Sequence, residues 1–547
     1  MTNISRRSAI KILAALGILS MGTAFVGCSE GNEQKALSSS GSAKSEKKYG
    51  KAIATNASMA TEVGKGILEQ GGNAVDAAVA VGFALGVVQP YGSGLGGGGG
   101  MLIYDIPSGK SDFIDYRIAA PSSFSSKKGS SCIPGFTKGA ELAHSLYGSM
   151  EWSKIIEPSL KLAEDGFAVD SSLASYISQY QGNLQGLEGY WGDDGKVVKR
   201  GDTLRQSQLA ATLRQISGKG SAGFYEGDIA NSVSSSIGCS LADLTAYQAK
   251  RRDCLSQQCM GFNFCVAPEP FSGAVVLTIL KCMDALGLPS PSSSPQEYLD
   301  ALNKSSSLAN KIRAKYLSDP DYSDPVDFDS LLSEENLTKL LGSGLSIGSG
   351  NSEPESDTTS SYSVMDDSGL LVVATNTLGE FFGSGSHCGG FFLNNGMDSF
   401  SAEGVNSYQA GKRPRTYTAP LVVDGGAFAF AAGSPGGTRI PKIMSQVLYS
   451  ALRDNMSLQQ AVDANRVLYL DDGTFAVEGD KDREDIVDFS KVSGYKTVKG
   501  TTKTYFGAVE IAGFDVNLGA VEIAGFDVNL GAVAVNDARR AGSAEVI

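Results

Sequence analysis

Apolar and polar residues follow two different patterns along the chain, and the change between them lies near residue 358. Apolar residues at helical spacing dominate from about 137 to 236 and again at 273–286. After 358 the chain becomes a series of short β-rich runs, with one helix predicted at 440–453. Between the two parts, residues 342–358 lose the apolar pattern and are rich in Gly, Ser, Glu and Asp. This composition is typical of an exposed loop, so we place a functional boundary there.

A buried helix and a glycine-rich strand are predicted near the start of the pattern. Asn73 is suited to cap a helix that continues to Val88, and because its apolar residues lie on every side, this helix should be buried. The glycines of 96–100 follow, and then the strand-like residues 101–104. No Gly-Lys-Ser/Thr follows the glycines and a strand comes next, so they indicate close backbone packing rather than a phosphate-binding loop.

The first 28 residues have the composition of an export signal. A charged region with Arg6 and Arg7 precedes an apolar run of about 12–26, which is too short for a stable membrane-spanning helix. The paired arginines resemble a twin-arginine export signal. Residues 25–28 resemble a lipoprotein cleavage site that begins, unusually, with Phe; lipidation of Cys28 is one interpretation and simple cleavage nearby is the other. We therefore expect an extracytoplasmic protein, either lipid-anchored or released.

The residues that follow the signal, 29–48, are rich in Ser, Lys, Glu and Gly. Such a segment cannot bury enough apolar surface to fold, so a solvated tether is predicted.

Composition limits the chemistry. The 547 residues have an ordinary globular balance, and the net charge of −13 argues against a nucleic-acid partner. There are only two histidines: His144, in a helical pattern, is interpreted as a structural or surface residue, and His387, in a Gly/Ser-rich stretch, as a plain loop residue rather than one that lines a site. We expect no metal and no cofactor, and any catalytic base should be a group other than imidazole.

Seven cysteines follow Cys28, and three of them, Cys254, Cys259 and Cys265, are close in sequence. They lack a CxxC pair and a nearby histidine, so a zinc site is disfavoured. Buried thiols or one local disulfide are the expected alternatives.

The C-terminal part contains a repeat, because residues 507–518 recur unchanged as 519–530. Two copies are too few for a solenoid. We interpret them as a duplicated hairpin, tolerated at a sheet edge or in a loop, that has no function of its own.

Residues 358–377 contain the candidate catalytic centre. Two β-rich runs flank the turn tetrapeptide 366–369, which is typical of a hairpin. If Asp366 opposes Gly369, Thr359 faces Asn376 and has Thr377 diagonally adjacent. A threonine at the start of one strand then lies beside a second threonine hydroxyl, although an ordinary β-branched pair would have the same pattern.

The loop before Thr359 favours a catalytic interpretation, because it leaves the 358–359 bond accessible. The threonine hydroxyl can attack the preceding carbonyl and convert the amide to an ester, which water then cleaves. The new α-amine would have an unperturbed pKa of about 7.7–8.0. It could serve as general base for its own hydroxyl, without histidine. Gly436 and Gly437, just before a predicted helix, could present backbone N–H groups to an oxyanion.

Together these segments resemble the γ-glutamyltransferase (glutathione hydrolase) family of N-terminal-nucleophile hydrolases. The matching segments are collinear over nearly all of residues 50–545 and include 71–78, 94–100, 115–121, 133–135, 156–158, 201–204, the hairpin from Thr359, 393–398 and 433–439. The resemblance implies an α+β fold, a four-layer αββα sandwich of two stacked antiparallel sheets, and self-cleavage into a large subunit (49–358) and a small one (359–547). It also implies hydrolysis or transfer of γ-glutamyl groups from small-molecule amides such as glutathione.

The resemblance assigns roles by position. Thr359 matches the nucleophile, and Thr377 matches the second threonine that hydrogen-bonds the amine or hydroxyl of the nucleophile. Gly436 and Gly437 match the oxyanion hole, and Arg117 matches the arginine that binds the substrate α-carboxylate.

Several positions depart from the family pattern. Ser361 stands where histidine is usual, and Gly379 where asparagine is usual. The two positions that hold the α-amino group are Gly396 and Ser399, and the usual serine pair is Thr416 and Tyr417. A substrate ammonium would lose several hydrogen bonds, each worth about 1.5–3 kcal/mol. The alternatives are an amidohydrolase for another acyl group, and a catalytically silent surface lipoprotein with the same fold.

Overall fold

The computed structural model describes residues 49–122, 130–185, 190, 196–287, 294–343, 358–454, 456–469, 474–478, 493, 496–499, 507–515 and 531–547. The predicted signal and tether lie outside these residues, as do most of the loop before Thr359 and the second copy of the duplicated segment. Among the described residues, no helix is both long and apolar enough to span a membrane.

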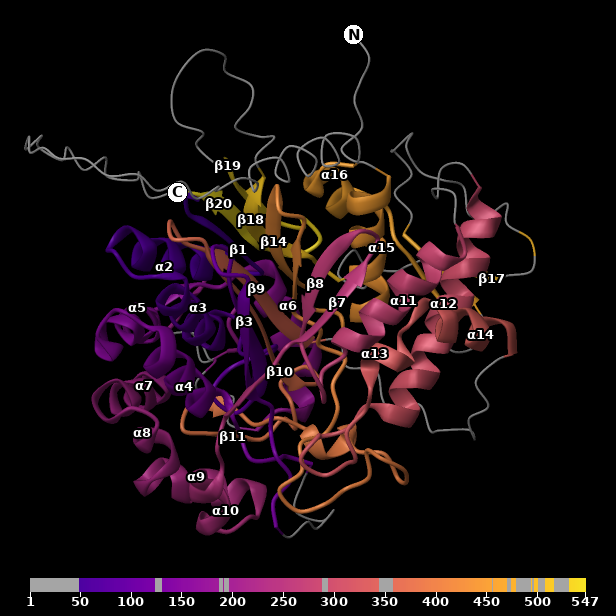
Figure 1. Ribbon diagram of the computed structural model, residues 1–547. Coiled ribbons are helices and arrows are strands. Elements are labelled where there is room, and N and C mark those ends of the chain that lie inside the picture. The colour runs from indigo at the N-terminus through magenta and orange to yellow at the C-terminus, as the bar shows by residue number, and fades with distance from the viewer. Residues whose placement is uncertain are drawn as a thin grey trace, which may run out of the picture. The chain divides into compact units, whose positions relative to one another are not determined.

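Two antiparallel sheets pack face to face at the centre of the fold (Figure 1). In spatial order the seven-stranded sheet contains β20 (Ser543–Val546), β1 (Ala52–Thr55), β9 (Thr358–Met365), β10 (Leu370–Gly379), β2 (Gly98–Asp105), β3 (Lys110–Tyr116) and β6 (Lys250–Arg252). The six-stranded sheet contains β19 (Gly531–Val535), β18 (Glu510–Asp515), β14 (Phe428–Gly433), β13 (Leu421–Asp424), β8 (Phe262–Val266) and β7 (Leu255–Cys259). Leu102, Val373 and Phe514 belong to the apolar core that both sheets share.

Helices cover the outer faces of the two sheets, so the fold has four layers (Figure 1). The seven-stranded sheet is covered by α2 (Ser58–Glu69), α3 (Ala74–Val88) and α4 (Phe136–Tyr147); α5 (Trp152–Asp165) packs on α3, and α7 (Ser207–Lys219) packs on α5. The helices beside the six-stranded sheet are α11 (Gly273–Ala285), α12 (Pro295–Tyr316) and α15 (Ile440–Arg453). The predicted αββα sandwich is confirmed.

Shorter elements complete the described chain. They are β4 (Phe167–Ala168), α6 (Ser171–Tyr180), η3 (Gln181–Asn183), β5 (Thr203–Leu204), α8 (Ala222–Tyr225), α9 (Gly227–Ile237), α10 (Leu241–Ala246), α13 (Phe328–Leu331), α14 (Glu334–Ser343), β11 (His387–Cys388), β12 (Phe391–Phe392), η5 (Gly396–Ser399), η6 (Gly437–Arg439), α16 (Leu458–Asp463), β15 (Val467–Tyr469), β16 (Thr474–Val477) and β17 (Lys496–Lys499). The helices predicted at 137–236, 273–286 and 440–453 are all present.

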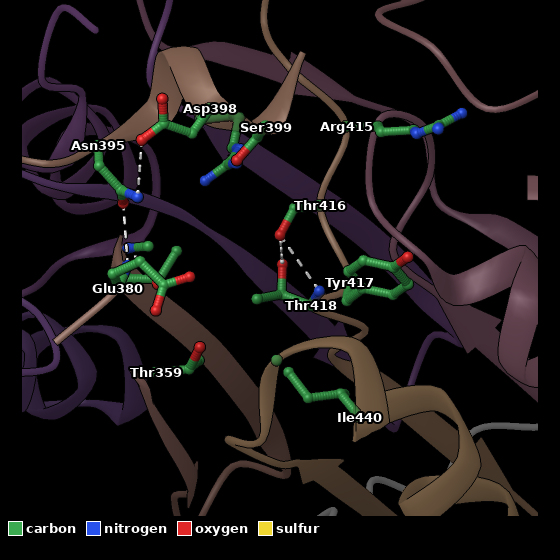
Figure 2. A pocket seen from close by; sticks show the side chains of 14 residues that line it. Thr359, Glu380, Asn395, Asp398, Ser399, Arg415, Thr416, Tyr417, Thr418 and Ile440 are labelled. Atoms are coloured by element: carbon green, nitrogen blue, oxygen red, sulfur yellow. Dashed lines mark hydrogen bonds between the residues drawn. The ribbon is translucent and has the colours of Figure 1, made fainter. Parts of the chain in front are cut away.

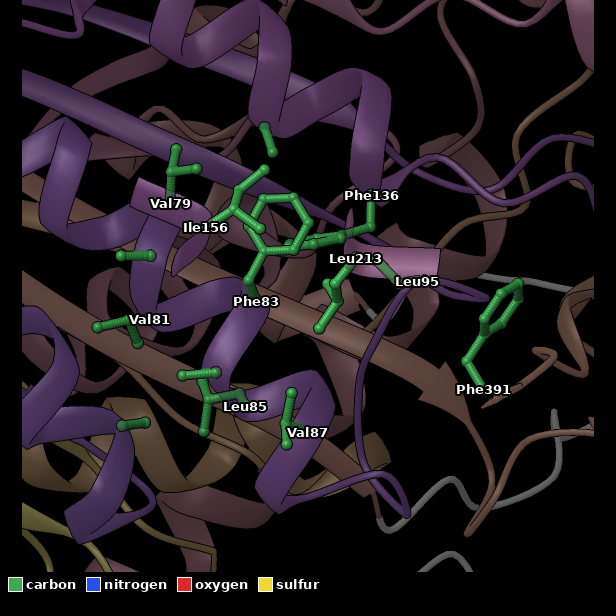
Figure 3. Packing of buried hydrophobic residues seen from close by; sticks show 14 of the residues in the cluster. Val79, Val81, Phe83, Leu85, Val87, Leu95, Phe136, Ile156, Leu213 and Phe391 are labelled. Carbon is green, nitrogen blue, oxygen red and sulfur yellow. The ribbon is translucent and has the colours of Figure 1, made fainter. Parts of the chain in front are cut away.

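The predicted buried helix is α3, which packs on the seven-stranded sheet (Figure 3). Its cap is reciprocal: the Asn73 side chain accepts hydrogen bonds from the N–H groups of Val75 and Asp76, each at 3.0 Å, and the Asp76 carboxylate accepts one from Asn73 N at 3.0 Å. Phe83 on the same helix packs edge to face on Phe136, with ring centroids 5.0 Å apart. The capping and the all-round burial are as predicted.

The glycine run brings three strands into close contact. It includes the start of β2, which lies between β10 and β3. A Cβ atom at Gly97 would lie 2.5 Å from the carbonyl oxygen of Thr377, and one at Gly99 would clash with the carbonyl oxygen of Thr375. The prediction of close backbone packing is confirmed, since a side chain here would push away the strand that carries Thr377.

The hairpin register differs by one residue from the prediction. Met365 pairs with Leu371, and Asn376 pairs with Ser360 instead of Thr359. Gly369 has a φ of +85°, and its N–H donates to Asp366 O at 3.0 Å, so the turn has one more residue than predicted. Such a turn combines a tight bend with a bulge, which shifts the whole ladder by one position.

The first copy of the duplicated segment contributes an inner strand. β18 lies between β19 and β14, so the prediction of a sheet edge is wrong for this copy. Its Glu510 is fully buried, and an inner position satisfies the backbone on both sides of the strand. The second copy lies outside the described residues.

Replacement of Asp76 tests the anchoring of α3. Besides Asn73 N, its fully buried carboxylate accepts hydrogen bonds from Ser149 N, Ser149 Oγ and Met150 N. We expect Asp76→Ala to lower the free energy of unfolding by about 3 kcal/mol, because these buried donors lose their acceptor. Urea denaturation followed by circular dichroism measures the change. Asp228→Ala, at the exposed first turn of α9, is the control, and equal midpoints for the two variants would contradict the prediction.

Candidate active site

Two threonine hydroxyls converge on one peptide carbonyl at the start of β9. Thr359 is 2% exposed, and its Oγ1 donates a hydrogen bond of 2.6 Å to Thr358 O. Thr377 Oγ1, from the end of β10, donates to the same oxygen at 2.8 Å. The Thr359 hydroxyl therefore lies beside the carbonyl of the preceding residue, and a second donor polarises that carbonyl.

The end of β10 fixes the direction of the second hydroxyl. The observed register, in which Asn376 pairs with Ser360, places Thr377 opposite Thr359, and the pairing becomes irregular only before Gly379, which pairs with Thr358. Gly379 N donates to Thr377 Oγ1 at 2.9 Å, so this oxygen accepts from the backbone while its own hydrogen points to Thr358 O. Thr358 is held in turn by a 2.7 Å hydrogen bond from its Oγ1 to Gly379 O.

Behind Thr359, β9 is held by a buried polar network that the sequence did not reveal. Ser361 N donates to Asn56 Oδ1 at 2.5 Å, and Asn56 Nδ2 donates to Glu510 Oε1 at 2.8 Å. Burial raises the pKa of the Glu510 carboxyl well above its usual range. Arg540 Nη1 donates to Thr359 O at 3.5 Å. These partners come from distant parts of the chain, and no local motif marks them.

The glycine turn after β14 lies at the same site. Gly437 lines the pocket together with Thr359 and Thr377. Gly436 and Gly437 have φ values of +135° and +57°, which other residues rarely adopt. The short helix η6 and then α15 begin here, so backbone N–H groups are available at a helix start.

The pocket brings together most of the residues predicted from the sequence (Figure 2). Within the described part of the chain, its lining is Arg117, Thr359, Thr377, Gly379, Glu380, Asn395, Asp398, Ser399, Arg415, Thr416, Tyr417, Thr418, Gly437 and Ile440. Two predicted residues are not in this lining. Gly436 is adjacent to it in the chain, whereas Gly396 packs against Ile118, with which a Cβ atom at that position would clash.

Neither histidine lines the pocket. His144 Nε2 is 2.8 Å from Met150 O, and its ring centroid is 5.3 Å from that of Trp152, as expected for a structural residue. His387 is in the short strand β11, not a plain loop, and its ring packs against Phe392 with centroids 4.9 Å apart.

The cysteines lie outside the described lining of the pocket. Each of the seven cysteines after Cys28 is a thiol in this structure, and five of them are buried. Within the described ranges, no group of three or more His, Cys, Asp or Glu side chains is arranged to hold a metal ion.

Arg117 is held in the pocket wall by buried charges and carbonyls. Its Nε donates to Pro414 O at 3.1 Å, and its backbone N donates to Asp115 Oδ1 at 2.9 Å. Asp115 is fully buried, 2.8 Å from Arg252 Nε and 3.5 Å from Arg413 Nε. The strand end that carries Arg117 is therefore rigidly placed.

Four pocket residues that could contact substrate carried no signal of their own in the sequence: Glu380, Asn395, Asp398 and Arg415. Asn395 Oδ1 accepts a 2.9 Å hydrogen bond from Glu380 N, and Asn395 Nδ2 donates to Asp398 Oδ2 at 3.2 Å (Figure 2). Burial raises the pKa of the Asp398 carboxyl. Asn395 and Asp398 belong to the segment 393–398 that carries part of the resemblance, which was the available indication.

A threonine hydroxyl beside its own preceding carbonyl, near the start of an inner strand of an αββα sandwich and in one pocket with a glycine turn, is the arrangement expected of N-terminal-nucleophile hydrolases. The family model for gamma-glutamyltranspeptidase matches residues 60–547, and the chain belongs to this family. The predictions of family, fold and enzyme class are confirmed.

Relatives support the same assignment. The chain is 35% identical over 453 residues to the capsule biosynthesis protein CapD proenzyme of Bacillus anthracis, covering 83% of this chain and 84% of that protein. It is 33% identical to the glutathione hydrolase proenzyme of Escherichia coli (strain K12), covering 76% and 80%. A cephalosporin acylase structure from Bacillus halodurans superposes with a TM-score of 0.78 at 23% identity, covering 96% of this chain and 99% of that one, and so supports the fold alone.

The shifted pKa of Glu269 should make the stability of the chain near the pocket depend on pH. It precedes Pro270, whose carbonyl accepts a 3.0 Å hydrogen bond from Thr416 N. Burial raises the pKa of the Glu269 carboxyl from 4.5 to about 8. The folded chain therefore keeps a proton that the unfolded chain releases above about pH 4.5, and the stability from this group falls as the pH rises towards 8.

We expect Glu269→Gln to become more stable relative to the wild type as the pH increases from 5 to 9, because glutamine carries no buried charge. Melting temperatures at intervals of one pH unit provide the test. Glu226→Gln, at an exposed position, is the control and should show no such trend. A difference between Glu269→Gln and wild type that is the same at every pH would contradict the prediction.

Proposed function

We propose that this protein cleaves itself before Thr359 and then hydrolyses or transfers γ-glutamyl groups through a threonyl ester. The convergence of the Thr359 and Thr377 hydroxyls on Thr358 O is the observation that carries the proposal. In the self-cleavage step, Thr359 Oγ1 attacks the Thr358 carbonyl carbon and the negative charge develops on the oxygen. The Thr377 hydroxyl stabilises that charge, and the Gly379 N–H strengthens Thr377 as a donor.

Collapse of this intermediate breaks the peptide C–N bond and transfers the Thr358 acyl group to Oγ1. Water then hydrolyses the ester, so that the upstream segment ends in a carboxylate and Thr359 gains a free α-amine. That amine acts as the general base for Oγ1 in later turnovers.

During turnover the γ-carbonyl of the substrate takes the place that Thr358 leaves. The backbone N–H groups of Gly436 and Gly437 are proposed to hold the oxyanion, and Arg117 to bind the α-carboxylate. Thr416, Tyr417 and Ser399 would complete the pocket around the acyl group. The first amine leaves, and water or a second amine then takes the γ-glutamyl group from the ester.

Glutathione-type amides are the proposed default substrates, since relatives include glutathione hydrolase proenzymes. A different acyl group is the second candidate. It is favoured by the absence of a side chain at Gly379 and by the packing of Gly396 outside the pocket. A catalytically silent protein of the same fold is disfavoured, because that role does not require two hydroxyls on one carbonyl.

We also propose export across the cytoplasmic membrane, because Arg6, Arg7 and the apolar run that follows resemble a twin-arginine signal. The chain would remain at the cell surface if Cys28 is lipidated, and would be released if it is not.

Replacement of the two threonines tests the self-cleavage. We expect wild type to give two fragments on denaturing electrophoresis, the smaller beginning at Thr359, whereas Thr359→Ala stays intact. Thr377→Ala should slow the cleavage by about 100-fold or more, because one donor to the developing oxyanion is lost. Thr377→Ser, which retains the hydroxyl, is the matched control and should cleave nearly normally. N-terminal sequencing identifies the cleaved bond. Cleavage of Thr359→Ala at the same bond would contradict the proposal.

A further inference from the structure

We propose that Glu380 binds the α-ammonium group of the acyl donor, in place of the side chains that are usual in the family at the positions of Gly379, Gly396 and Ser399. The inference rests on the proposed function and names a group that selects its substrate. It starts from the pocket lining, where Glu380 is next to Gly379 and shares the cavity with Thr359 and Arg117.

The position of Glu380 depends on the glycine before it. Gly379 has a φ of +98°, and a Cβ atom there would clash with Asn395 Oδ1. Because residue 379 has no side chain, Asn395 approaches the backbone and accepts the 2.9 Å hydrogen bond from Glu380 N. The loss of a side chain at 379 therefore fixes the backbone of the next residue at the pocket wall. Figure 2 shows the Glu380 carboxylate between Asn395 and Thr359.

At Gly396, the second glycine position, the usual side chain cannot be restored by a simple substitution. A Cβ atom at Gly396 would clash with Ile118 Cδ1 and lie 3.0 Å from Cys132 Sγ, in a small apolar cluster that also contains Met397. A glutamine at this position would need the cluster to repack. The pocket is thus built around glycine at both positions, and an ammonium group requires a partner from elsewhere.

The charges in the pocket suit a zwitterion. Arg117 and Glu380 line the same cavity and have opposite signs, so the carboxylate and ammonium of an α-amino acid head group can each meet the complementary charge. Asp398 adds a second carboxylate to the lining and accepts the hydrogen bond from Asn395 Nδ2. It positions Asn395, which in turn holds Glu380 N.

The test compares two chromogenic amides that differ only in the ammonium group: γ-glutamyl-p-nitroanilide and glutaryl-p-nitroanilide. We expect the wild type to prefer the γ-glutamyl amide. Glu380→Gln should lower kcat/KM for this substrate by about tenfold or more, mainly through KM, since a charge-assisted contact is lost. Its kcat/KM for the glutaryl amide should stay within about threefold of wild type, because that substrate has no ammonium to bind.

Two further variants separate recognition from folding. Glu380→Asp keeps the charge and should recover part of the preference, while Glu403→Gln removes an exposed carboxylate from the chain segment after η5 and should leave both rates unchanged. Self-cleavage and melting temperature of Glu380→Gln should match wild type, since neither needs the ammonium contact.

Three outcomes would overturn the inference. If Glu380→Gln lowers kcat/KM for both amides equally, Glu380 has a structural role. If wild type cleaves the glutaryl amide as well as the γ-glutamyl amide, the pocket does not recognise the ammonium group. In both cases Thr359 still acts as the nucleophile, so the proposed function stands. A processed wild type that cleaves neither amide overturns the γ-glutamyl function and this inference together.

Discussion

The hydrogen bond from Thr377 to Thr358 O is the interaction on which the proposed catalytic arrangement depends. It requires two strand ends to meet within hydrogen-bonding distance, and several packing constraints serve that requirement. The glycines at the start of β2 allow β10 to lie close, and the register of the hairpin places Thr377 opposite Thr359. Because interiors are densely packed, a shift of either strand would separate the donor from its carbonyl.

A second constraint is that the buried polar groups around β9 need hydrogen-bond partners. Asn56 and Glu510 satisfy the backbone and each other in an almost dry environment, where an unpaired group would be costly. Such a network keeps the strand head in one conformation. The proposed mechanism needs that order, because the amine and hydroxyl of Thr359 would have to stay aligned with the reacting carbonyl.

The sequence predicted the architecture well, because long elements have strong periodic patterns and clear caps, as in the helix that begins after Asn73. It predicted that Thr359 and Thr377 lie close together but not the register of the two strands. The register depends on the extra turn residue Gly369, which the sequence pattern did not reveal. Glu380 and Asn395 were missed for a similar reason. Their meeting depends on the space left by Gly379, which becomes visible only when 379 and 395 are seen side by side.

The strand order has a consequence for any cut at residue 358. In the seven-stranded sheet, β1 from the upstream segment is inserted between β20 and β9 from the downstream segment, and β2, β3 and β6 extend the sheet beyond β10. The six-stranded sheet likewise joins β8 and β7 to four downstream strands. Two chains produced by such a cut would contribute alternating strands to the same sheets, and would share hydrogen-bond ladders and a single core. They could part only by unfolding, so the heterodimer would inherit the cooperativity of one polypeptide.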